Sequence, residues 1–156
     1  MTQARILTAG LEMAEVLSEL HTICFDPLPE TPWPATAMRT ILRMPGIHSY
    51  ALWDCEPAPV GLLIGRETRD EAEVLTVCVS PTARRKGFAR DLFTAFIGDI
   101  ACGTRLVLEV AVDNKNAIEL YKSLKFQEVG RRPNYYRVGK SRIDALIMAR
   151  QTASVV

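Results

Sequence analysis

The most chemically distinctive part of this sequence is a basic turn that follows a strand-forming stretch and precedes a run with helical spacing. The stretch is Val77, Cys78 and Val79, and the turn is Arg84, Arg85, Lys86, Gly87, Phe88, Ala89 and Arg90. The first N–H groups of a helix have no partner within it, and the helix dipole adds positive charge there. A phosphate fits at that position, small residues let it approach the backbone, and cations add charge-assisted contacts. The turn therefore predicts a site for a phosphorylated ligand.

Two common nucleotide sites do not fit this turn. The Lys-Ser/Thr pair of a P-loop does not follow Gly87, and a dinucleotide fingerprint needs G-x-G-x-x-G. RNA binding through Arg84, Arg85 and Lys86 is disfavoured because the patch is short and lacks interleaved aromatic residues. Considered alone, the turn is equally compatible with an ordinary solvated connection.

A carboxylate and a phenol downstream are candidates for proton transfer. In the strand-forming residues 105–110, Glu109 and Val107 point to one face, while Leu106, Leu108 and Val110 point to the other. A carboxylate set among apolar neighbours is partly desolvated, which strengthens it as a base. Tyr121 lies on the apolar stripe of a predicted helix, 114–124. A solvent-facing glutamate and a core tyrosine are the alternatives at these two positions.

Hydrophobic periodicity indicates the elements that position these groups. Strand-forming patterns cover residues 5–9, 47–53, 60–66, 73–79, 105–110, 126–132 and 143–149. Helical patterns cover residues 10–25, 35–44, 84–101 and 114–124, with Asn114 as the N-cap of the last. A proline-rich loop at 26–34 joins the first two helices. This order predicts an α/β fold in one domain, 1–156, with a mixed, mostly antiparallel sheet flanked by helices.

Composition excludes several classes of protein. The chain has 156 residues, 48% of them hydrophobic and 24% charged, with a net charge of +1, as expected for a soluble globular protein. Such a charge gives no global attraction to nucleic acid or to an anionic membrane. No apolar stretch is long enough to span a bilayer, and Glu12, Glu15 and Glu19 interrupt any secretory signal. We therefore expect a cytoplasmic protein.

The cysteine pattern predicts reduced thiols and no metal site. Cys24, Cys55, Cys78 and Cys102 have no C-x-x-C spacing, and neither histidine lies near a cysteine pair. Cys24, Cys78 and Cys102 stand in apolar contexts that suit small buried side chains. A nucleophilic cysteine with a histidine partner is the less favoured alternative.

Two linked motifs resemble the GCN5-related N-acetyltransferase (GNAT) superfamily. The first is Arg84-x-x-Gly87-x-Ala89 after a Val-x-Val strand, and the second is Leu108-Glu109-Val110 followed by Asn114, Ala117, Leu120-Tyr121, Leu124 and Phe126. The resemblance implies acetyl-CoA as co-substrate, with its pyrophosphate on the turn amides. It also implies that its pantetheine arm pairs with the backbone of Val77, Cys78 and Val79 as an added strand would.

Within the superfamily, the chain is most similar to the ribosomal-protein-alanine N-acetyltransferases. The supporting residues are Pro32-Trp33, Asn134-Tyr135-Tyr136 and Asp144-Ala145-Leu146-Ile147-Met148. The similarity implies Glu109 as base and Tyr121 as proton donor to the coenzyme A thiolate. Asn114 would cap its helix and contact the cofactor, and Trp33, Tyr135 and Tyr136 would contact the acceptor, with both tyrosines between the last two strands.

The implied acceptor is the N-terminal α-amine of a protein, with a ribosomal protein as the expected case. A small amine or amino acid is the alternative acceptor, and a non-catalytic coenzyme-A-binding or interaction module is the alternative of another class. Three residues depart from the family pattern: Lys125 stands where relatives usually carry glycine, Ala111 where they often have a basic side chain, and Ile143 where an acidic residue is frequent. Glycine suits a left-handed helix C-cap, so lysine there costs on the order of 1 kcal/mol.

Overall fold

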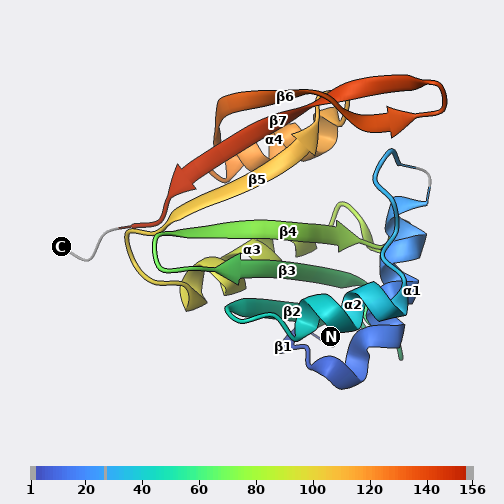
Figure 1. Ribbon diagram of the computed structural model, residues 1–156. Helices are drawn as coiled ribbons and strands as arrows, with labels where there is room; N and C mark the ends of the chain where they lie inside the picture. Colours follow the sequence, from blue (N-terminus) through green and yellow to red (C-terminus); the bar gives the residue numbers. More distant parts are fainter. Residues whose placement is uncertain (1–2, 27, 154–156) are drawn as a thin grey trace.

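The computed structural model describes residues 3–26 and 28–153, and these build one seven-stranded sheet in the order β1-β2-β3-β4-β5-β7-β6. The strands are β1 (Arg5–Thr8), β2 (Ile47–Trp53), β3 (Gly61–Glu67), β4 (Glu71–Val79), β5 (Arg105–Ala111), β6 (Gln127–Val138) and β7 (Ser141–Gln151). Among these described strands, only β4 and β5 pair in parallel (Figure 1). The predicted mixed, mostly antiparallel sheet is confirmed, while Pro27 of the predicted loop lies outside the described residues.

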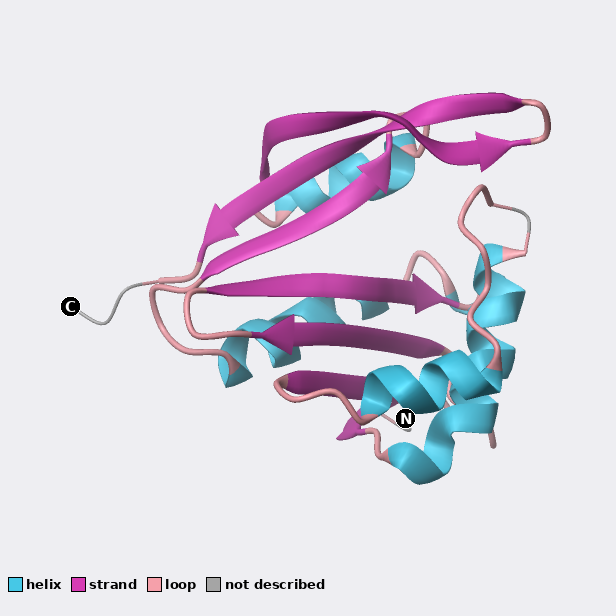
Figure 2. Ribbon diagram, viewed as in Figure 1, coloured by secondary structure: helices cyan, strands magenta, loops and turns pink. Residues whose placement is uncertain are grey.

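Helices cover both faces of the sheet (Figure 2). They are α1 (Ala14–Phe25), which follows a 3₁₀ turn at Leu11–Met13, α2 (Ala35–Leu42), α3 (Phe88–Asp99) and α4 (Lys115–Ser123). Leu17 of α1 and Met38 of α2 are buried against one face, and Phe93 and Phe96 of α3 belong to the core on the other. In the described part of the chain, no helix is both long and apolar enough to cross a membrane.

The two central strands separate along their length. The pairing of β4 with β5 joins Glu71–Glu73 to Arg105–Val107, and both strands then continue, to Val79 and Ala111. Just beyond this pairing, the register between β3 and β4 shifts so that Leu75 is an extra residue in β4. A bulge of this kind bends its strand and increases the local twist. The edge of β4 that faces β5 is thereby left open from Val74 to Val79.

The last hairpin is longer than its apolar pattern indicates. Its strands were expected at 126–132 and 143–149, but β6 runs to Val138 and β7 starts at Ser141. Most of β6 is exposed, so it lacks buried apolar residues at alternate positions, and Pro133-Asn134 is a turn signal. The strand absorbs that dipeptide as an irregularity between Arg132 and Tyr136. The prediction that Tyr135 and Tyr136 lie between the last two strands was therefore wrong.

The second residue after α4 adopts the left-handed conformation that its position requires. Lys125 has φ +71° at the C-terminal end of this helix, as its place in the sequence predicts. We expect Lys125→Gly to raise the free energy of unfolding by about 1 kcal/mol, because glycine adopts this conformation without strain. Urea denaturation will measure the change. Lys125→Ala, which keeps a Cβ, serves as the control, and an equal gain with alanine would contradict the explanation.

Candidate active site

A cleft of about 1320 Å³ opens where β4 and β5 separate. Its volume exceeds the ~300–1,000 Å³ that is usual for one small ligand, so it has room for two substrates. The predicted site residues that line it are Trp33, Val77, Cys78, Val79, Arg84, Arg85, Gly87, Phe88, Ala89, Arg90, Glu109, Asn114, Tyr121, Tyr135 and Tyr136. Lys86 is not among the lining residues, because its Nζ pairs with Asp54 at 2.8 Å.

The turn before α3 has the backbone that an anion site requires. Gly87 is the N-cap of α3 with φ +82°, and Arg85 is also left-handed, with φ +68°. Gly87 provides no side-chain cap, so no side chain at this position covers the first N–H groups of α3. A Cβ built on Gly87 meets nothing within 4 Å, so the space beside it is open. A pyrophosphate fits this geometry, and the open edge of β4 suits an extended pantetheine arm.

Two of the predicted cations are held by neighbouring elements. Arg84 donates from Nε to the carbonyl oxygen of Val79 at 3.0 Å, which ties the turn to the end of β4. Arg90 donates to Ser123 Oγ at 2.7 Å, which joins α3 to the end of α4. Both line the cleft. They therefore shape the turn as well as contribute charge to it.

Glu109 lies on β5 on the face that alternation predicts, since Leu108 and Val110 are buried on the other face. Its surroundings are more polar than expected. Glu109 Oε1 accepts a hydrogen bond from Arg132 Nε at 2.6 Å, and its side chain is 19% exposed. The negative charge of Glu109 is the main cause that raises the pKa of nearby Tyr135, with burial second. The carboxylate is thus held by an ion pair with Arg132 and by a hydrogen bond from Tyr135, rather than simply desolvated.

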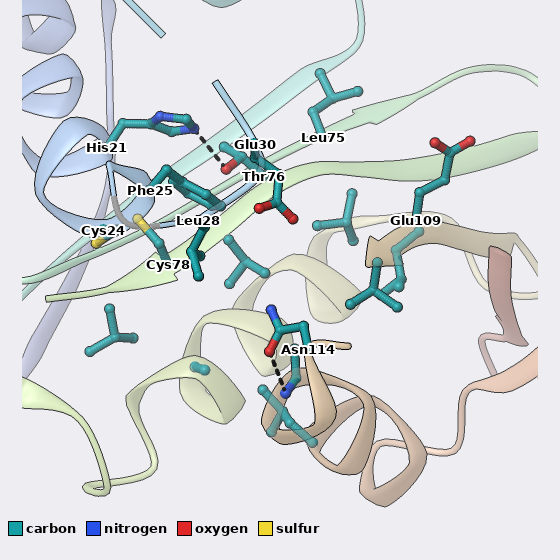
Figure 3. A pocket seen from close by; sticks show the side chains of 18 of the residues that line it. His21, Cys24, Phe25, Leu28, Glu30, Leu75, Thr76, Cys78, Glu109 and Asn114 are labelled. Atoms are coloured by element: carbon teal, nitrogen blue, oxygen red, sulfur yellow. Dashed lines mark hydrogen bonds between the residues drawn. The ribbon is translucent and has the colours of Figure 1, made fainter. Parts of the chain in front are cut away.

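Tyr121 reaches the cleft from α4 with its ring in the core. The side chain is 8% exposed and packs edge-on against Phe93 and Phe126, with ring centroids 5.8 and 6.0 Å away. Burial, and then the charge of Glu30, raises the pKa of this phenol above its ordinary value. The phenol therefore keeps its proton at neutral pH. Asn114 caps α4 as predicted, with Oδ1 accepting from Ala117 N at 3.3 Å (Figure 3).

A buried histidine fastens the loop that carries Trp33. The backbone N–H of Trp33 donates to His21 Nδ1 at 3.1 Å, so neutral His21 carries its proton on Nε2 and donates it to Thr76 Oγ1 at 3.1 Å (Figure 3). Ser18 Oγ donates to the carbonyl oxygen of Trp33 at 2.7 Å. His21 also stacks between Phe25 and Trp33. The extra residue in β4 helps place Thr76 toward α1.

Lowering the pH is expected to destabilise the protein through His21. Burial lowers the pKa of His21 from its ordinary 6.5 to about 4. The unfolded chain then binds more protons than the folded one between these values, so the free energy of unfolding falls as pH decreases from 6.5 to 4, by about 3 kcal/mol in total. Urea denaturation of the wild type and of His21→Gln across this range will isolate the contribution. Parallel curves for the two proteins would contradict it.

Several residues of the cleft carry no signal in the sequence. Glu30 lines it from the proline-rich loop, and His21 fastens that loop, although neither stands in a recognisable motif.

Cys24 and Cys78 are buried and Cys55 is exposed, while Cys102, expected in an apolar context, is exposed in the turn after α3. A helix that ends at Asp99 leaves Cys102 outside the core.

Comparison with known proteins identifies the family. Residues 13–126 match the Acetyltransferase (GNAT) family, and the chain belongs to this family. N-alpha-acetyltransferase RimI of Mycobacterium tuberculosis is 37% identical over 127 residues, covering 79% of this chain and 78% of that protein. The ribosomal protein bS18-alanine N-acetyltransferase of Salmonella typhimurium is 39% identical over 82 residues, covering 51% of this chain and 55% of that protein.

Solved structures agree on the fold. The ribosomal-protein-S18-alanine N-acetyltransferase from Escherichia coli has a TM-score of 0.86 at 24% identity, covering 99% of this chain and 97% of that one. Arabidopsis thaliana NAA60 in complex with acetyl-CoA has a TM-score of 0.79 at 20% identity, with 96% and 98% covered. The predicted family and fold are confirmed, and the chain is an N-acetyltransferase.

Proposed function

We propose that this protein transfers the acetyl group of acetyl-CoA to the N-terminal α-amine of a protein, with ribosomal protein bS18 as the first acceptor to test. The observation that carries the proposal is one continuous cleft, which joins the turn before α3 to Glu109 and Tyr121. Relatives named as N-alpha-acetyltransferase and as bS18-alanine N-acetyltransferase support the type of acceptor. A cytoplasmic location and a single catalytic domain over residues 1–156 belong to the same proposal.

The cofactor half of the cleft supports acetyl-CoA binding in two ways. The uncapped N–H groups of α3, with Arg84, Arg85 and Arg90 nearby, suit the pyrophosphate. The open edge of β4 at Val77, Cys78 and Val79 provides backbone groups for the pantetheine amides. Asn114, the N-cap of α4, also lines this cleft. This arrangement directs the thioester toward the point where β4 and β5 diverge.

The acceptor half supplies the proton transfers. Glu109 accepts a proton from the amine through Oε2, because Arg132 occupies Oε1. The amine nitrogen attacks the thioester carbonyl, and Tyr121 donates its proton to the departing thiolate. Trp33, Tyr135 and Tyr136 line the same side and are proposed to contact the first residues of the acceptor.

A thiol-release assay with acetyl-CoA tests the acceptor directly. We expect turnover with a peptide that carries the bS18 N-terminus and much slower turnover with free amino acids and polyamines. The same peptide with an acetylated N-terminus serves as the control, because it lacks the reacting amine. Turnover of free amines alone would support the small-amine alternative. If the protein binds coenzyme A but releases no thiol from acetyl-CoA with any acceptor, the non-catalytic alternative would be supported.

A further inference from the structure

The most unusual polar group in the cleft is Glu30, in the loop between α1 and α2. Its Oε2 atom is buried and has no hydrogen-bond partner among the residues that the structure describes. The side chain lines the main cleft and also a smaller adjoining pocket. Figure 3 shows its carboxylate directed into the cleft. A buried, unpaired carboxylate oxygen is costly, so this arrangement suits a ligand that supplies the missing donor.

The groups around Glu30 make it a site for a cation. Burial raises the pKa of Tyr121 from α4 and of Tyr136 from β6, and the negative charge of Glu30 adds to the effect on each phenol. Burial raises the pKa of Glu30 itself, and the negative charge of Asp113 adds to this effect. Lys115 and Arg137 are the cations that share the smaller pocket with Glu30. Among the described residues, neither donates a hydrogen bond to Oε2 of Glu30, so this oxygen is available to a cation that arrives through the cleft.

Counting protons shows why a second carboxylate is useful. An α-ammonium has a pKa near ~8 and arrives mostly protonated at neutral pH, so it loses one proton before attack and a second afterwards. Glu109 is positioned for only one of these transfers in each turnover, and Arg132 already holds one of its oxygens at 2.6 Å. Oε2 of Glu30 has no partner among the described residues, and after burial the charge of Glu30 is the next cause that raises the pKa of Tyr121, the proposed proton donor to the thiolate.

We propose that Glu30 binds the ammonium group of the acceptor and removes its first proton. The inference rests on the proposed function and adds a catalytic residue to it. An N–H bond breaks, its electron pair stays on nitrogen, and Glu30 becomes a carboxylic acid. The neutral amine forms the C–N bond, Glu109 takes the second proton from nitrogen, and the C–S bond breaks as Tyr121 protonates sulfur. Glu30 then returns its proton to Tyr121 and Glu109 releases one to water, so each turnover releases one proton.

The test compares Glu30→Gln with the wild type on whichever amine the wild type acetylates. Because the variant loses a charge-assisted contact, we expect the acceptor KM to rise by roughly 10-fold or more, with the acetyl-CoA KM unchanged. Without Glu30, only amine that arrives neutral reacts, so kcat/KM should climb about tenfold per pH unit up to the amine pKa near ~8. Glu119→Gln, an exposed acid on α4, is the matched control. An unchanged acceptor KM and pH profile would overturn the inference.

A binding measurement separates this inference from the proposed function. Calorimetry in the presence of coenzyme A compares the bS18 N-terminal peptide with its N-acetylated form, which has no ammonium group. We expect the free peptide to bind the wild type roughly 10-fold more tightly than Glu30→Gln, and the acetylated peptide to bind both equally. Equal binding of the free peptide to both proteins would overturn the role of Glu30 even if turnover is normal. If only small amines are acetylated, the proposed acceptor fails, and the same comparison with those amines decides on Glu30.

Discussion

Replacing Glu109 by glutamine is expected to lower kcat by on the order of 10²–10⁴-fold, the usual contribution of a general base. Glutamine has nearly the same shape but does not accept a proton from an ammonium group at neutral pH. The side chain lies at the point where β4 and β5 diverge, away from the turn before α3 that is proposed to bind the pyrophosphate. The dissociation constant of acetyl-CoA should therefore stay nearly unchanged. Steady-state kinetics from pH 6 to 9, together with calorimetry, will measure both quantities.

The matched control for this variant is Glu71→Gln. Glu71 is also a strand glutamate paired with an arginine, Arg105, at 2.6 Å, but it does not line the cleft. Any general effect of breaking a strand ion pair appears in both variants and should be within about 1 kcal/mol for such exposed pairs. A loss of kcat only in Glu109→Gln assigns the effect to the site. Wild-type turnover across the whole pH range would remove Glu109 from the mechanism.

Replacing Tyr121 by phenylalanine is expected to lower kcat by about 100-fold, because the departing thiolate loses its proton donor. The ring and its contacts with Phe93 and Phe126 are kept, so the free energy of unfolding should change little. Burial raises the pKa of this phenol, so in the wild type Tyr121 stays protonated as the pH rises toward the ordinary tyrosine value. The alkaline limb of the wild-type profile should accordingly show no loss from its ionisation.

Tyr50→Phe controls for the removal of a buried tyrosine hydroxyl. Tyr50 is 3% exposed and donates to Asp99 Oδ2 at 2.6 Å, outside the lining of the cleft. This variant should lose about 1 kcal/mol of stability, because it removes one hydrogen bond to an exposed carboxylate, yet it should keep wild-type kcat. The opposite pattern, with slow turnover for Tyr50→Phe and normal turnover for Tyr121→Phe, would contradict the assignment of the proton donor.

Local sequence patterns were sufficient to predict the order of the elements and several details of the site. Alternation in β5 correctly placed Glu109 opposite Leu108 and Val110, and an asparagine before an amphipathic run correctly marked the cap of α4. The position of Lys125 after a helix predicted its left-handed backbone. Each of these depends on residues within one or two turns of each other, so neighbouring side chains and backbone preferences are sufficient to determine them.

Other features depend on contacts between distant segments. The ion pair of Arg132 with Glu109 joins β6 to β5, and Lys86 turns to Asp54 in the β2–β3 loop, so neither partner was evident from its own neighbourhood. The exposed strand β6 has no apolar periodicity. The sequence pattern therefore predicted Tyr135 in a loop, whereas the structure has it in a strand. Glu30 lay in a proline-rich loop with no pattern at all.

The sequence by itself determined the family, the type of cofactor site and the identities of two candidate proton-transfer residues, because these depend on short motifs with fixed spacing. Only the tertiary structure showed that the turn before α3, Glu109 and Tyr121 share one cleft, and that Glu30 enters it unpaired. The bulge at Leu75 and the divergence of β4 from β5 create that cleft. Burial and pairing are properties of the packed chain, and they are the reason that Glu30 is proposed to receive the amine.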